Sequence, residues 1–301
     1  MNNRTETPYQ HITVSPLAGA LGAEIGGVDL ARPLDDATLA EVRRAFLENL
    51  VIFFRDQDLS PEAHKAFARH FGELHVNTYF PTVEGHEDVQ LIVKEPSDVK
   101  NIGDRWHSDV TYKKQPALGS LLYAKETPAA GGDTMFSNMY LAFESLSEGM
   151  REMLRGLDGY HSAKERFQEI VADAAKPNQG GAGFTFQEGF EQEAVHPAIR
   201  THPETGRDAL YVNSSFTQRF DGLTVEESQP ILKFLFDHVG RPEFTCRFHW
   251  TPGSLAFWDN RCAQHYAIND YNGHRRHMNR VTVLGDTPFL ASRKDPARVA
   301  A

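Results

Sequence analysis

The sequence predicts an α+β protein that is mainly β, with a jelly-roll core of two sheets and flanking helices. Many short segments are either alternately or continuously apolar, as strands are, and turn residues separate them. Helical patterns cluster before and between these segments, which favours a double-sheet core. With 301 residues, 40% of them apolar, the chain can bury a sizeable core, and we expect one domain over 1–301.

Four helices are predicted from capping residues and apolar spacing. Ser60 and Pro61 offer an N-cap followed by proline at the first helical position. Thr224 and Glu227 form a capping-box pattern. The four predicted helices span residues 35–50, 60–72, 147–156 and 224–240. None of them carries an obvious chemical motif.

Strand patterns fill the intervals between the helices. Residues 244–250 alternate apolar and polar side chains, and Thr251-Pro252-Gly253-Ser254 then makes a turn into 255–258, which predicts a hairpin. Further strands are predicted at residues 51–54, 89–93, 119–124, 209–212 and 276–284. Residues 168–194, which include a glycine-rich stretch, are expected to form a long loop and are a candidate active-site lid.

Composition excludes several classes of protein. The net charge of −10 disfavours nucleic acid and anionic membranes as partners. The two cysteines form no disulfide framework, which favours a reducing compartment. The N-terminus lacks an apolar signal core, and the longest early apolar run, residues 50–54, is far too short to cross a bilayer. We therefore expect a cytoplasmic protein whose anionic ligands are held by specific cations.

Two His-x-Asp triplets are candidate metal motifs. Residues i and i+2 of a strand point to one face, so an imidazole and a carboxylate at this spacing can meet one ion. His86 follows a glycine in a charged, turn-like segment, which favours a solvated loop. His107 and Asp109 precede Val110-Thr111-Tyr112, a context that favours strand structure. The second triplet is the better candidate.

A third donor would complete a facial arrangement of two histidines and one carboxylate, which leaves positions open on Fe(II). The candidates are His265, His249, His277 and His274. His265 follows the predicted strand 255–258, where the chain would return to the mouth of the core. The residues alone leave the choice open.

Arg276 and Arg280 are four residues apart in the alternating strand 276–284, so they project to one face about 13 Å apart. Inward-facing guanidinium groups are costly to bury without anions. Either they form surface ion pairs, or they are two clamps for carboxylate or sulfonate groups.

Four features together resemble the taurine dioxygenase/TfdA family of Fe(II)- and 2-oxoglutarate-dependent dioxygenases. They are Trp106-His107-Ser108-Asp109, Gly131-Gly132-Asp133-Thr134, Trp258-Asp259-Asn260 with His265, and the pair Arg276 and Arg280. The spacing is specific, because His265 follows His107 by 158 residues and the two arginines follow His265 by 11 and 15. The resemblance covers nearly the whole chain and implies a double-stranded β-helix.

The resemblance also implies roles for individual residues. His107, Asp109 and His265 would be catalytic and bind Fe(II), Thr134 and Arg276 would hold the distal carboxylate of 2-oxoglutarate, and Arg280 would hold the anionic end of the substrate. The substrate pocket would be lined by Val110, Phe167, Phe216 and Asn77. Asn77 stands where taurine dioxygenase has a sulfonate-binding histidine, and Gly103 replaces an asparagine, which argues against taurine itself.

The expected reaction is hydroxylation of a small organic anion next to a heteroatom, with dioxygen as the second cosubstrate and succinate and CO2 as co-products. The substrate would be an alkanesulfonate, an alkyl sulfate or an aryloxyalkanoate, and the hydroxylated product would collapse with C–S or C–O cleavage. The alternatives are hydroxylation of a carboxylate metabolite without cleavage, and a non-catalytic jelly roll that binds a metal or an anion. The resemblance also implies a homo-oligomer, a dimer or a tetramer.

Overall fold

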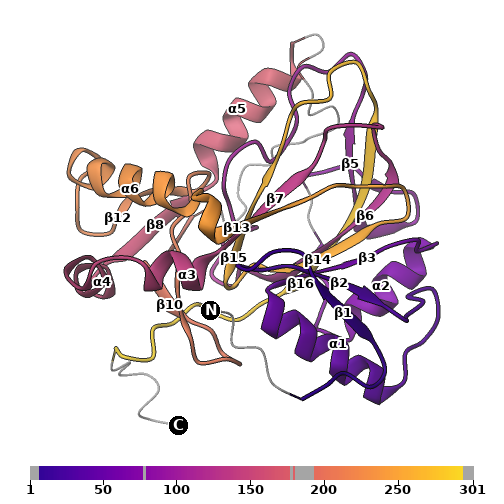
Figure 1. The fold of residues 1–301 in the computed structure, drawn as a ribbon. Coiled ribbons are helices and arrows are strands. Elements are labelled where there is room, and N and C mark those ends of the chain that lie inside the picture. The colour runs from indigo at the N-terminus through magenta and orange to yellow at the C-terminus, as the bar shows by residue number, and fades with distance from the viewer. Residues whose placement is uncertain (1–6, 77–78, 177–178, 180–192, 294–301) are drawn as a thin grey trace.

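The computed structural model describes residues 7–76, 79–176, 179 and 193–293 (Figure 1). Its main sheet contains, in spatial order, β1 (Thr13–Pro16), β2 (Ala23–Gly26), β3 (Val51–Phe54), β14 (Leu255–Asp259), β6 (Ala117–Glu126), β16 (Arg276–Leu284), β5 (His86–Lys94) and β4 (Thr82–Val83). A second sheet has the order β13 (Thr245–Phe248), β7 (Thr134–Asn138) and β15 (Ala263–Ala267). Two smaller sheets combine β12 (Thr217–Phe220), β8 (Asp158–Ser162) and β9 (Glu193–Pro197), and β10 (Ile199–Thr201) and β11 (Asp208–Leu210).

The helices lie around these sheets. They are α1 (Asp36–Asn49), α2 (Pro61–Arg69), α3 (Met139–Glu144), α4 (Glu148–Arg155), α5 (Lys164–Ala174) and α6 (Val225–Val239), with a short 3-10 helix at Pro242–Phe244. In Figure 1, α1 and α2 lie beside the N-terminal strands, whereas α3, α4 and α6 gather on the opposite side of the molecule. The described sheets do not close into a barrel.

Both faces of the main sheet are covered, as strand β3 illustrates. Its four residues are all buried, because successive side chains enter different layers. Phe53 faces the second sheet and stacks on Phe248 of β13, with ring centroids 4.0 Å apart. Phe54 faces the helices and meets Phe67 of α2 edge-on at 5.7 Å. The main sheet therefore has an apolar layer on each face, one between the sheets and one under α1 and α2.

The four predicted helices are confirmed, together with their caps. Ser60 accepts a hydrogen bond from the backbone of Ala63, and Thr224 and Glu227 form the predicted capping box. The second helix ends at Arg69, a little before the predicted stop. Local capping chemistry thus fixed where these helices begin.

The long loop predicted at 168–194 is partly wrong. Residues 168–174 belong to helix α5, and β9 begins at Glu193. Ala163 at the start of α5 makes no side-chain cap hydrogen bond, so the sequence carries no start signal there. Residues 177–178 and 180–192 lie outside the described residues. The prediction that this segment forms an active-site lid is therefore not tested by the structure.

The predicted hairpin of 244–250 with 255–258 is also wrong. Strand β13 pairs with β7 in the second sheet, whereas β14 pairs with β3 and β6 in the main sheet. The turn between them passes from one sheet to the other. Gly253 and Ser254 are held there by backbone hydrogen bonds to Ala124 of 2.9 and 2.8 Å. Both edges of β14 are used by other strands, so none is left for β13.

Among the described residues, no helix is long and apolar enough to cross a membrane.

Candidate active site

Two histidines and one aspartate from distant parts of the chain meet at the edge of the second sheet. His265 lies on β15, and His107 forms an isolated β-bridge with it through backbone hydrogen bonds of 3.1 and 2.8 Å. Their ring centroids are 4.0 Å apart, and Asp109 Oδ1 lies 3.9 Å from His107 Nε2. One ligand atom of each buried side chain lies within 4.8 Å of the others. The fold thus brings the three predicted ligands together.

Asp109 reaches this cluster from a turn. Only His107 makes a β-bridge, and residues 109–112 form turn structure. Val110 has a φ of 49°, in the left-handed region that β-branched residues rarely adopt. The prediction that a strand would project His107 and Asp109 from one face is therefore wrong, although the two side chains do converge.

The main sheet fixes the position of the Asp109 carboxylate. Ser120 on β6 donates a hydrogen bond to Asp109 Oδ2 at 2.7 Å. The backbone N–H of Asp109 and the indole N–H of Trp258 both donate to Asn260 Oδ1 at 3.0 Å. Because the main sheet holds Asp109 and the second sheet holds His265, the cluster lies where the two sheets converge.

Burial and charge set the protonation of the cluster. Burial alone would raise the pKa of the Asp109 carboxyl, but Arg280 and the two histidines hold that pKa below its ordinary value. Burial lowers the pKa of both His107 and His265. His107 Nδ1 lies 2.7 Å from the carbonyl oxygen of Arg105, so the neutral ring donates from Nδ1 and keeps a lone pair on Nε2. At neutral pH the cluster presents two neutral imidazoles and one carboxylate.

This donor set fits a divalent transition metal. His265 Nδ1 is buried and has no hydrogen-bond partner among the described residues, so it is a polar atom in need of one. Two imidazoles and one carboxylate are the facial set of non-haem Fe(II) oxygenases, which leaves positions for further ligands. The residues present therefore fit Fe(II).

Arg280 lies directly beside the cluster. Its Nη1 group is 3.3 Å from Asp109 Oδ1, and its Nε donates to Gln90 Oε1 at 2.8 Å. Its guanidinium carbon lies 5.2 Å from the centroid of the Phe80 ring. Within the described part of the chain its Nη2 group makes no hydrogen bond, so a positive donor remains for an anion next to the metal position.

Arg276 lies deeper in the fold, at the start of β16. It is 6% exposed, and its Nε and Nη2 atoms have no hydrogen-bond partner in the described ranges. Its guanidinium carbon lies 5.6 Å from the ring of Trp250, whose indole N–H donates to Thr134 Oγ1 at 3.0 Å. The Thr134 hydroxyl thereby accepts from Trp250 and keeps its own proton for a further acceptor. Both residues suit a buried carboxylate.

A cavity of ≈ 60 Å³ adjoins the metal position. The predicted residues His107, Asp109, Arg280, Val110, Phe167 and Phe216 line it, together with Gly103, Phe80 and Tyr112. Thr134 and Arg276 are not in this lining, and Arg276 lines a separate narrow cavity. Asn77 lies outside the described residues. Its arginines and its mostly apolar walls match the chemistry of an anionic group attached to a carbon chain.

The other histidine candidates do not join the cluster. His249 Nδ1 lies 2.8 Å from Asp133 Oδ1, and His86 lies at the start of β5 with its Nδ1 3.2 Å from Glu62. His86 is therefore in a strand, not in the predicted loop, and makes a surface contact. Among the described residues, neither His277 nor His274 belongs to a group of potential metal ligands.

Sequence reasoning missed several site residues. Ser120 and Gln90 contact Asp109 and Arg280, but a single polar residue in a strand carries no signal of such a role. Arg166 lines both the cavity and a larger hollow of ≈ 380 Å³ next to it. It pairs with Asp104 and with Glu169. Its place in the unpredicted helix α5 explains why it was missed.

In a second cluster, the potential ligand atoms of His202, Asp259 and Cys262 also lie within 4.8 Å of one another. His202 Nδ1 accepts hydrogen bonds from the backbone N–H groups of Glu204 and Thr205, so its proton is on Nε2, which contacts Asp259 at 3.0 Å. Arg261 donates to the same carboxylate at 2.7 and 2.8 Å. No lone pair of this histidine is left for an ion, so the cluster is structural.

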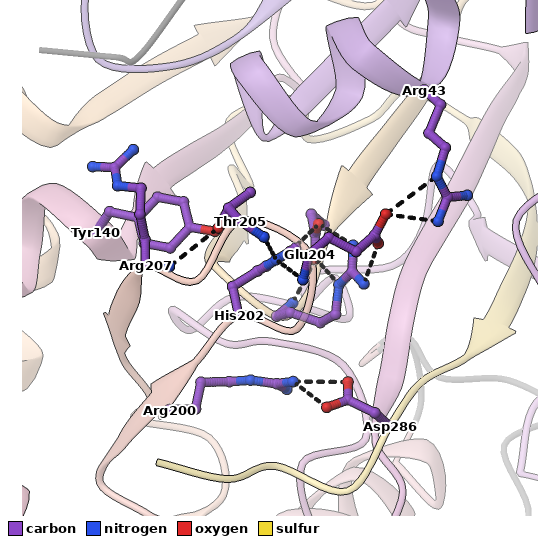
Figure 2. A network of polar contacts seen from close by, with 10 residues as sticks. Arg43, Tyr140, Arg200, His202, Glu204, Thr205, Arg207 and Asp286 are labelled. Atoms are coloured by element: carbon purple, nitrogen blue, oxygen red, sulfur yellow. Dashed lines mark hydrogen bonds and ion pairs between the residues drawn. The ribbon is translucent and has the colours of Figure 1, made fainter. Parts of the chain in front are cut away.

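Figure 2 shows how this network continues outward. Glu204 accepts from Arg261 at 2.8 Å and from Arg43 of α1 at 2.7 Å. Nearby, Arg200 makes two hydrogen bonds to Asp286, of 2.8 and 2.9 Å (Figure 2). The Asp259 of the Trp258-Asp259-Asn260 motif thus stabilises the fold behind the active site, while Asn260 serves the site itself.

A family model described as "Taurine catabolism dioxygenase TauD, TfdA family" matches residues 13–282. The chain belongs to the TauD/TfdA family. It is 35% identical over 280 residues to the alpha-ketoglutarate-dependent sulfate ester dioxygenase of Pseudomonas putida, covering 92% of this chain and 91% of that protein. It is 32% identical over 287 residues to an alkylsulfatase of Acinetobacter baylyi, covering 95% and 89%. A crystal structure of a taurine dioxygenase from Burkholderia xenovorans superposes with a TM-score of 0.78 at 38% identity, covering 94% of each chain.

These findings confirm two predictions, the reaction class and the fold. From its family and its relatives, the chain is a 2-oxoglutarate-dependent dioxygenase. Alpha-ketoglutarate, the word in the relatives' names, is another name for 2-oxoglutarate. Its fold is the jelly roll of its structural relatives. The non-catalytic binding module considered above is thereby excluded.

Proposed function

We propose that this TauD/TfdA enzyme uses Fe(II), 2-oxoglutarate and dioxygen to hydroxylate a small organic anion at the carbon next to a heteroatom. An alkyl sulfate or an alkanesulfonate is the proposed substrate class. The single observation that carries the proposal is the position of Arg280, 3.3 Å from a candidate metal ligand and inside a small, mostly apolar cavity. A cation beside the metal aims the anionic end of a substrate, and the neighbouring carbon then faces the ion.

The cosubstrate half of the site is assigned to different residues. His107, Asp109 and His265 would hold the ion, and Thr134 and Arg276 would hold the distal carboxylate of 2-oxoglutarate. Fe(II) bound with 2-oxoglutarate would supply the oxidising power, with succinate and CO2 as co-products. The contribution of the chain is orientation and charge. The Nε and Nη2 atoms of Arg276 are buried without a hydrogen-bond partner among the described residues, so they give the distal carboxylate a site that exposed arginines would not.

The substrate half combines Arg280 with an apolar wall, while the other arginine of the lining, Arg166, pairs with Asp104 and Glu169. Phe167 and Phe216 both pack against Tyr112, with ring centroids 5.4 and 5.0 Å from it. These rings pack against the carbon chain of a substrate and exclude water from the reacting carbon. Arg280 can form forked hydrogen bonds with a sulfate or a sulfonate.

The product of such a hydroxylation is unstable. An alkyl sulfate R–CH2–OSO3⁻ would become R–CH(OH)–OSO3⁻, which breaks its C–O bond and yields the aldehyde, sulfate and a proton. An alkanesulfonate would yield the aldehyde and sulfite by C–S cleavage. The names of the two curated relatives, a sulfate ester dioxygenase and an alkylsulfatase, support the sulfate as the first compound to test.

The test is a substrate panel scored by succinate release from the protein supplied with Fe(II) and 2-oxoglutarate in air. The panel contains an alkyl sulfate, taurine, another alkanesulfonate, an aryloxyalkanoate and the matching alkyl carboxylate. We expect succinate and sulfate or sulfite in equal amounts with one of the organosulfur anions. Phenol release would point to the aryloxyalkanoate, and a hydroxylated carboxylate without cleavage would support the other enzymatic alternative.

His107→Ala serves as the control without a complete metal site, because it removes one ligand. Succinate release that no member of the panel stimulates above the substrate-free rate would contradict the proposed substrate class.

A further inference from the structure

A narrow cavity beside the active-site cavity contains a second cation that the proposed mechanism has not used. Lys94, Arg276, Tyr271 and Asn101 line it together with Lys100, whose charge is paired with Asp173 at 2.6 Å, and Ile102 lines both cavities. Lys94 is the last residue of β5, and Arg276 is the first residue of β16. The cavity thus lies at the end of the main sheet where these two strands meet.

Lys94 and Arg276 stand directly opposite each other in the antiparallel pair of β5 and β16. Residues at such positions project to the same side, with Cβ atoms about 4.5–5.5 Å apart, and like charges there destabilise a sheet. Lys94 is 4% exposed and Arg276 is 6% exposed. The fold therefore buries two positive charges side by side, which is costly unless an anion joins them.

Neither cation has found an anion within the described part of the protein. Lys94 Nζ, Arg276 Nε and Arg276 Nη2 are all buried without a hydrogen-bond partner. The ammonium group lies 4.4 Å from the centroid of the Tyr271 ring, a cation–π contact that does not neutralise its charge.

The nearby carboxylates are engaged elsewhere. Glu95 pairs with Arg275 at 3.1 Å, and Asp98 accepts a hydrogen bond from the backbone of Glu95 at 2.9 Å. Arg275 also pairs with Glu126 at 2.6 Å. Two buried cations thus border a space that no described acidic side chain fills.

We propose that Lys94 is a second cation for the distal carboxylate of 2-oxoglutarate, acting together with Arg276. The inference rests on the proposed function, in which Arg276 and Thr134 hold this carboxylate. Lys94 contributes a mobile point charge, and Arg276 contributes a planar fork. With both cations present, the site favours a 2-oxo acid with two carboxylates over one with a single carboxylate, because only the former places a negative charge between the two cations.

The test measures binding without turnover. Protein loaded with Mn(II) is titrated by calorimetry with 2-oxoglutarate and, separately, with 2-oxopentanoate, which has the same chain length but lacks the distal carboxylate. Lys94→Met keeps the apolar stem and removes the charge. A hydrogen bond to a charged group corresponds to roughly a ten- to hundredfold change in Kd. We expect Lys94→Met to weaken 2-oxoglutarate binding by about that factor and to leave 2-oxopentanoate binding unchanged.

Lys125→Met is the matched control. Lys125 also lies over a tyrosine ring, with its Nζ 5.4 Å from the centroid of Tyr123, but it is exposed at the end of β6. This control variant should bind both 2-oxo acids as the wild type does. Lys94→Arg, which keeps the charge, should retain most of the preference for 2-oxoglutarate and provides a second variant if Lys94→Met does not fold.

The outcomes separate the two proposals. If the wild type prefers 2-oxoglutarate and Lys94→Met keeps the same preference, the role of Lys94 is refuted and the proposed function stands. Equal weakening of both acids would assign Lys94 a merely structural role and would also refute the inference. If the wild type binds neither acid, the proposed function fails and the inference fails with it.

Discussion

Replacing Arg280 with methionine tests the division of labour between the two arginines. The substitution keeps an apolar stem beside Phe80 but removes the charge 3.3 Å from Asp109. A hydrogen bond to a charged group contributes about 1.5–3 kcal/mol, and each 1.4 kcal/mol is a tenfold change in affinity. We therefore expect the KM for the anionic substrate to rise roughly ten- to hundredfold.

The affinity for 2-oxoglutarate should change much less, because Arg276 and not Arg280 lines the cavity assigned to its distal carboxylate. Calorimetry with Mn(II)-loaded protein measures this affinity, and succinate release at varied substrate concentration measures the KM. Arg275→Met is the matched control, since its ion pairs with Glu95 and Glu126 lie at the surface and contribute little. Weakened 2-oxoglutarate binding with an unchanged substrate KM would mean that the roles of the two arginines are exchanged.

Three further predictions concern metal retention and stability. His107→Ala and Asp109→Ala should each lose Mn(II) at micromolar protein in equilibrium dialysis, because one of three ligands is gone; retention equal to the wild type would refute the metal assignment. Arg261→Met should lower the free energy of unfolding by about 3–5 kcal/mol in urea titrations, because the buried Asp259 carboxylate loses its guanidinium partner; a change below 1 kcal/mol would contradict this. Burial lowers the pKa of His64 to about 4, so its folded pKa lies below its unfolded value of about 6.5 and stability falls as pH drops through this window. Between pH 7 and pH 5 the wild type should lose about 2 kcal/mol more than His64→Leu, and equal losses would refute the assignment.

The sequence predicted the parts of the fold that local chemistry decides. Helix starts at Ser60 and Thr224 follow from their own side chains, and the bounds of β16 follow from its alternation. The predicted hairpin failed because strand pairing depends on residues far away, here β3 and β6, which occupy both edges of β14. Helix α5 was missed because it has no capping side chain.

In the candidate site, too, the sequence predicted some residues, whereas the roles of others depend on the folded structure. The resemblance supplied the metal ligands and both arginines, because their spacing along the chain is distinctive. The turn that carries Asp109 could not be predicted, because a positive φ at Val110 is disfavoured locally and is imposed by the surrounding fold. The charge of Lys94 is visible in the sequence, but its burial opposite Arg276 depends on the register of two strands far apart in the chain.

The most direct test of the central claim, that His107, Asp109 and His265 hold one metal ion, is anomalous diffraction from crystals grown with Mn(II) and N-oxalylglycine, an analogue of 2-oxoglutarate. We predict one strong manganese peak within bonding distance of these three side chains, with the distal carboxylate of the analogue at Arg276. A peak at His202, Asp259 and Cys262 instead, or no peak at either cluster, would contradict the account.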